Sequence, residues 1–165
     1  MGGDVNTDSE GFVVGVRQLW RGGRGYVEFC RLREDVVLVV LGGHLDGGAA
    51  GYLVENLPAL IDRPGMSVFW DGGDLASHGA RVPAQIVPAL ARLRRNIDEF
   101  HVLIRSPLLT MTAAAANLAL GGELSVYRER AHFDEAIISE VIQPAWSRFA
   151  FDARACFDGQ MASAC

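Results

Sequence analysis

The sequence predicts a single α/β domain in which four helices flank a mixed, mostly parallel β-sheet. Short, continuously apolar runs alternate along the chain with amphipathic helical stretches, and turn residues follow most of the apolar runs. Strand–helix–strand units in one sheet are right-handed crossovers, which makes the sheet mostly parallel. The 165 residues are 50% hydrophobic and 21% charged, enough apolar surface for one packed domain.

The first part of the chain is expected to form an arm followed by a β-hairpin. Residues 1–24 are the arm, and its apolar stretch Phe12–Trp20 is expected to be a strand or a docked segment. The second strand of the hairpin is apolar at every position, which is typical of a central strand. We expect that strand to end at Gly42–Gly43. The hairpin strands are Tyr26–Arg33 and Val36–Leu41, joined at Glu34–Asp35.

The rest of the chain alternates helices with strands. Helix starts are marked by Asp46 as a cap, by Pro83 and by Ser106–Pro107. The order is therefore β-β-α-β-α-β-α-β-α over a domain of residues 25–145, with a C-terminal tail at 146–165. The expected helices are Ala49–Ile61, Val82–Arg95, Leu108–Leu120 and Phe133–Gln143, and the expected strands are Ser67–Trp70, Phe100–Ile104 and Ser125–Tyr127.

The composition excludes several classes of function. A net charge of -5 argues against nucleic-acid binding, because phosphate contacts need clustered cations. All 15 basic residues are arginine, which excludes a Schiff-base lysine and the lysine of a P-loop. The three cysteines form no CxxC pair and no disulfide framework. With no signal-peptide pattern and no apolar run long enough to span a bilayer, we expect a cytoplasmic protein without membrane insertion.

Polar side chains gather where two neighbouring strands are expected to end. The carboxyl ends of parallel strands are the edge at which open α/β sheets bind ligands and partners. These residue types suit a divalent metal, but their spacing matches no named site, and helix caps and turns explain the aspartates. We therefore expect neither a metal nor a cofactor. The residues are His44 and Asp46 after the first strand, and Asp71, Asp74, Ser77 and His78 after the second.

No catalytic signature is present in the sequence. The G-x-S-x-G pentapeptide of a hydrolase is absent, and so is the G-x-G-x-x-G cofactor loop. Ser106 precedes a helix, but Pro107 has no N–H to offer an oxyanion hole. We therefore expect that the protein is not an enzyme and has no catalytic residues.

Three stretches resemble the STAS domain family, the sulfate-transporter and anti-sigma-factor antagonist domains. VVLVVLGGHLD at 36–46 is similar to the family's hydrophobic strand followed by a G-x-L-D turn. VFWDGGDLASHG at 68–79 is similar to the strand that leads into the functional loop. LALGGELSVYRERAHFDEAI at 118–137 is similar to the closing helix, short strand and last helix. The resemblance covers about Tyr26 to Ile142 and implies the fold derived above.

The resemblance also implies a bacterial signalling module. In the anti-sigma antagonists, a partner kinase phosphorylates a serine at the start of the second helix, within Asp-Ser-Ser-Gly. This chain has Asp-Leu-Ala-Ser-His-Gly at 74–79, and Ser77 is the nearest match to that phosphoacceptor. The implied partner is a kinase-like or regulatory protein, bound through the loop from Asp71 to Ala80, with Asp71, Asp74, Ser77 and His78 as its contacts. A phosphate would add about -1.5 to -2 charge beside the two aspartates.

Three alternatives stay open at this point. Ser77 is also explained as a plain turn residue. The cluster of acidic residues and histidines, with His44 and Asp46, is the expected site if the protein is a small-ligand binder or an uncharacterised enzyme. A homo-oligomer is the third alternative, with self-association through the alanine-rich helix at 108–120 or through the stretch at 12–20.

Overall fold

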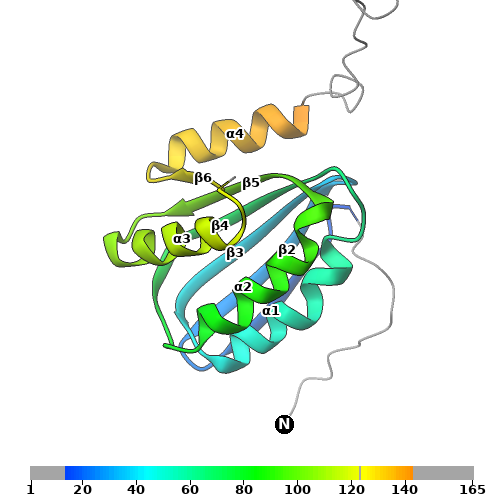
Figure 1. The fold of residues 1–165 in the computed structure, drawn as a ribbon. Helices are drawn as coiled ribbons and strands as arrows, with labels where there is room; N and C mark the ends of the chain where they lie inside the picture. The colour runs from blue at the N-terminus through cyan, green and yellow to red at the C-terminus, as the bar shows by residue number, and fades with distance from the viewer. Residues whose placement is uncertain (1–13, 123, 143–165) are drawn as a thin grey trace, which may run out of the picture.

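A six-stranded sheet with four helices forms the body of the protein (Figure 1). The computed structural model describes residues 14–122 and 124–142, without the side chains of Leu108 and Ala119. The strands are β1 Arg17–Gly22, β2 Gly25–Arg33, β3 Val36–Leu45, β4 Met66–His78, β5 Ile97–Ile104 and β6 Leu124–Tyr127. The helices are α1 Gly47–Leu60, α2 Val82–Leu93, α3 Pro107–Ala119 and α4 Arg130–Ile142, with a 3₁₀ turn at Arg94–Asn96.

The strands lie in the sheet in the order in which they occur in the sequence. β1, β2 and β3 pair antiparallel, whereas β3, β4, β5 and β6 pair parallel. The predicted mixed, mostly parallel sheet with four helices is confirmed, and so is the element order from β2 onward. β1 adds one strand at the edge, from within the expected N-terminal arm. Residues 1–13 of that arm and the expected tail at 146–165 lie outside the described residues.

The helices cover the two faces of the sheet unequally. The larger core packs α1, α2 and α3 against one face, and a smaller core packs α4 against the other (Figure 1). β4 contributes to both cores, because Val68 and Trp70 point into the larger one and Phe69 into the smaller one. This alternation explains why Ser67–Trp70 is buried on both faces, as the apolar run predicted.

The expected ends of β3 and β4 are wrong. β3 continues past Gly42–Gly43 to Leu45, and β4 continues past Trp70 to His78. The two extensions pair with each other, with register shifts on either side of the glycine pair. Gly43 has φ +70°, and its position lets the His44 N–H donate to the Arg24 carbonyl oxygen at 3.1 Å. The glycines were expected to end the two strands. Both strands instead continue past them and keep pairing, with irregularities in the register.

Candidate functional site

His44 and Ser77 meet at the carboxyl ends of β3 and β4. They are cross-strand partners in the parallel pair, and His44 Nδ1 lies 2.7 Å from Ser77 Oγ. Both residues are half-buried. Ser77 therefore lies on a strand, five residues before α2 begins at Val82, and not at the start of that helix as the resemblance implied. The expected partner-binding loop from Asp71 is a strand as far as His78.

Asp71 is held by an arginine from the far end of the chain. Its carboxylate is paired with both terminal nitrogens of Arg130, and Oδ1 also accepts the Gly73 N–H at 2.9 Å. The hydrogen bond from Asp71 is the main reason why the pKa of Arg130 is raised. Arg130 was not among the predicted site residues, because it lies 59 positions after Asp71 and no local sequence pattern indicates that the two meet.

Tyr26 and Asp74 extend the polar surface on the side of α4. The Tyr26 ring packs over Gly42, where a Cβ would lie 2.1 Å from the ring. Burial raises the pKa of the Tyr26 phenol, and the negative charges of Asp74 and Asp71 raise it further. Asp74 itself is exposed. The hairpin register, which pairs Tyr26 with Gly42, is the signal that would have found this tyrosine.

Asp46 and His78 have separate roles. The Asp46 side chain accepts the Ala49 N–H at 3.0 Å and caps α1, as predicted. His78 Nε2 lies 3.4 Å from Thr112 Oγ1 on α3, on the opposite face of the sheet from Ser77. The expected set therefore does not converge on one point. Within residues 14–122 and 124–142, no three His, Cys, Asp or Glu side chains are grouped as metal ligands would be.

Comparison with known proteins identifies the fold. Neither a family model nor a curated protein sequence matches the chain. A structure of an uncharacterised DUF3478-family protein with a SpoIIAA-like fold, from Shewanella loihica PV-4, aligns with a TM-score of 0.53 at 12% identity, over 76% of this chain and 98% of that one. The Bacillus cell fate determinant SpoIIAA in its phosphorylated form aligns with a TM-score of 0.50 at 17% identity, over 67% and 98%.

The chain therefore has the SpoIIAA-like fold, which is the anti-sigma-factor antagonist fold implied by the sequence resemblance. At these identities the likeness concerns the fold alone. Among the described helices, none is both long enough and apolar enough to cross a membrane.

Proposed function

We propose that the protein is a non-enzymatic regulatory module that binds a protein partner through the carboxyl end of β4, and that phosphorylation of Ser77 gates this binding. The observation that carries the proposal is the 2.7 Å contact between Ser77 Oγ and His44 Nδ1 at that end of the sheet. The fold supports it, because SpoIIAA, a protein of the same fold, has been solved in a phosphorylated form.

A phosphate on Ser77 would change both the hydrogen bonding and the charge at this edge of the sheet. Replacing the hydroxyl hydrogen by a phosphate removes the hydrogen bond that the Ser77 hydroxyl can donate to His44. It also adds about -1.5 to -2 charge on a strand that already carries Asp74 and Asp71. The added charge is repelled by the carboxylate of Asp74 and by acidic groups of a docked partner, so phosphorylation is expected to release the partner.

A pull-down from source-cell lysate tests the proposal, with wild type, Ser77→Ala and Ser77→Glu as baits and mass spectrometry as the readout. Ser125→Glu is the matched control, because Ser125 is an exposed serine on the edge strand β6. We expect a partner that binds wild type, Ser77→Ala and Ser125→Glu but not Ser77→Glu. Recovery of the same proteins by all four baits would contradict gating at Ser77, provided that circular dichroism shows each bait to be folded.

The His44–Ser77 distance also fits a second candidate, an enzyme in which histidine activates a serine nucleophile. Such pairs need a third group that orients the base. In the part of the chain that the structure describes, no carboxylate is hydrogen-bonded to His44, which favours the regulatory proposal. Hydrolysis of an activated ester such as p-nitrophenyl acetate by wild type, lost in Ser77→Ala and His44→Ala, would favour the enzyme instead.

A further inference from the structure

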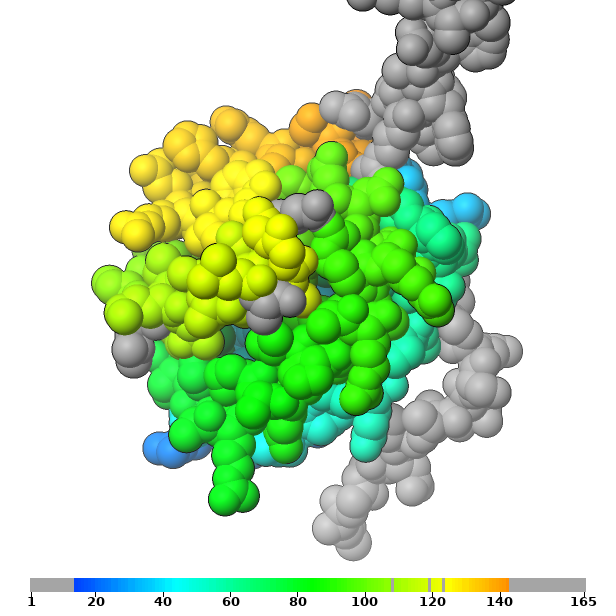
Figure 2. Space-filling view, in the orientation of Figure 1, coloured from blue at the N-terminus to red at the C-terminus, as the bar shows by residue number. Residues whose placement is uncertain are grey.

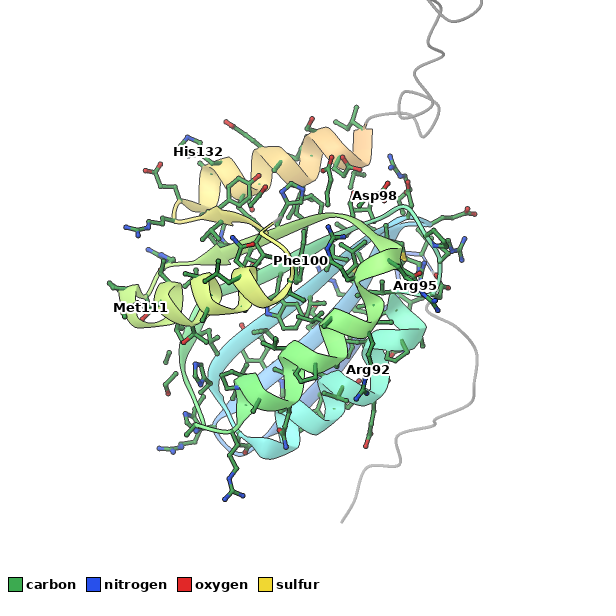
Figure 3. All side chains as sticks on the ribbon, viewed as in Figure 1. Arg92, Arg95, Asp98, Phe100, Met111 and His132 are labelled. Atoms are coloured by element: carbon green, nitrogen blue, oxygen red, sulfur yellow. The ribbon has the colours of Figure 1, made fainter. Side chains whose placement is uncertain are left out.

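An apolar pocket of about 130 Å³, partly open to solvent, lies between the sheet, α2 and α3, on the face opposite to Ser77. Trp70 and Phe100 line it from the strands, Ile86 from α2, and Ala113 and Ala116 from α3. Figure 3 shows Phe100 between the ribbons of α2 and α3, and Figure 2 shows this side of the molecule with its atoms in full. Apolar surface left open in this way is typical of ligand-binding grooves and interaction sites, so the pocket calls for an explanation.

The alanines of α3 explain why the space exists. Four consecutive residues of the helix, 113–116, are alanine, and Ala113 and Ala116 face the cavity with one methyl group each. A single methyl group does not reach the aromatic rings on the strands. Small side chains would let this helix pack close to the sheet, but the structure leaves room between the two.

The chemistry of the wall selects an apolar occupant. The lining is almost entirely carbon, and Trp70 and Phe100 present rings whose centroids are 6.0 Å apart and whose planes are tilted by 47°. A buried water needs two to four polar partners, which such a wall does not supply. Its polar side chains are His78 and Thr112, which meet at 3.4 Å between the end of β4 and α3.

We infer that this cavity is a binding site for a small apolar ligand, about the size of one aromatic ring, with any polar group directed toward His78 and Thr112. The size follows from comparison with an engineered apolar cavity of about 150 Å³ in another protein, which takes up benzene. This inference does not depend on the proposed function, because Ser77 and His78 are adjacent on β4 and point to opposite faces.

Calorimetric titration of the full chain with benzene and with phenol tests the inference. We expect saturable binding of one molecule per chain. Ala113→Leu should weaken it at least tenfold, because the larger side chain occupies the space. Ala114→Leu is the matched control, since Ala114 is exposed on the same helix and is not part of the wall. Both changes replace alanine by another good helix former.

The second cavity-filling variant, Ala116→Leu, gives the same test if Ala113→Leu does not fold, as judged by circular dichroism. Phenol binding should fall in Thr112→Val, while benzene binding should not. The inference is overturned if wild type binds neither probe saturably, or if Ala113→Leu and Ala116→Leu bind benzene as tightly as Ala114→Leu does.

Discussion

Arg130 and Asp71 form a two-pronged ion pair that joins the first turn of α4 to the middle of β4. Arg130 Nη2 lies 3.0 Å from Asp71 Oδ1, and Nη1 bonds Oδ2. The Asp71 side chain is only 9% exposed, whereas that of Arg130 is 44% exposed. Because a buried carboxylate is costly unless it is paired, Arg130 is what allows a charged Asp71 beneath α4.

Replacing Arg130 by methionine should therefore destabilise the fold. The change leaves the Asp71 carboxylate with the Gly73 N–H and no cation, and we expect the free energy of unfolding to fall by about 2 kcal/mol. Urea denaturation followed by circular dichroism measures it. Arg128→Met, at an exposed position two residues earlier, should change stability by no more than about 0.5 kcal/mol. Equal losses in the two variants would mean that the ion pair contributes nothing specific.

Much of the fold could be predicted from local patterns, because the elements that were found carry their own signals. Val36–Leu41 and Ser67–Trp70 are apolar on both faces, and each lies within a strand of the sheet. The Asp46 cap located the start of α1 to within two residues. The ends of β3 and β4 could not be predicted in this way. Whether Gly42–Gly43 stops a strand or bends it depends on the pairing offered by β4, which is a tertiary property.

The candidate site was predictable only in part. The prediction that the polar residues following the two apolar runs lie at one edge of the sheet leads to the His44–Ser77 contact. Ser77 and His78 point to opposite faces of the sheet because β4 continues through both residues. The loop expected there would not impose this alternation. The pairing of Asp71 with Arg130 depends on where α4 packs against the sheet, and no local sequence pattern indicates that position.

A buried arginine, Arg31, holds the end of α1. Its side chain donates to the Leu60 carbonyl oxygen at 2.9 Å and to the Glu34 carbonyl oxygen at 2.7 Å, and the residue is 2% exposed. The last carbonyl groups of a helix have no partner within the helix, so Arg31 supplies a donor where solvent is excluded.

We predict that Arg31→Met lowers the free energy of unfolding by about 3 kcal/mol, since buried carbonyl oxygens lose a charged donor. Hydrogen exchange should show the loss first at the carboxyl end of α1. Arg24→Met, which replaces an exposed arginine on the turn between β1 and β2, serves as control. Unchanged protection of α1 in Arg31→Met would show that the helix end does not depend on this arginine.

Asp62 gives the fold a sensitivity to acid. The pKa of Asp62 is lowered, chiefly by the hydrogen bond from Arg63 and also by the charge of Arg31, whose Nη2 lies 3.3 Å away. Because the pKa is lower in the folded state, the stabilisation is complete above the unfolded value of about 3.9 and is lost as the pH falls through the folded value.

Asp62→Asn should therefore make the loss of stability below about pH 4 shallower than in wild type. Thermal unfolding at a series of pH values between neutral and strongly acidic conditions measures the slope. Glu55→Gln, which removes an exposed negative charge from α1, controls for the change in net charge. An identical slope in Asp62→Asn and wild type would contradict the prediction.

Gly43 and Gly51 provide a matched pair of glycine-to-alanine changes with opposite expected signs. Gly43 has φ +70°, and a methyl group there would lie 2.2 Å from the Arg24 carbonyl oxygen, so backbone would have to move. We expect Gly43→Ala to lower the free energy of unfolding by about 3 kcal/mol. Gly51 lies within α1 and a methyl group there meets nothing within 4 Å, so Gly51→Ala should raise it by about 1 kcal/mol.

The Gly43 variant also tests the link between the bend in β3 and the proposed site. Gly43 precedes His44, and the register shift between them sets the pairing of His44 with Ser77. A backbone displaced by the added methyl group should separate those side chains, so Gly43→Ala should weaken partner binding in the pull-down while Gly51→Ala does not. Urea denaturation of both variants gives the stabilities, and comparable losses would show that the left-handed conformation of Gly43 imposes no special requirement.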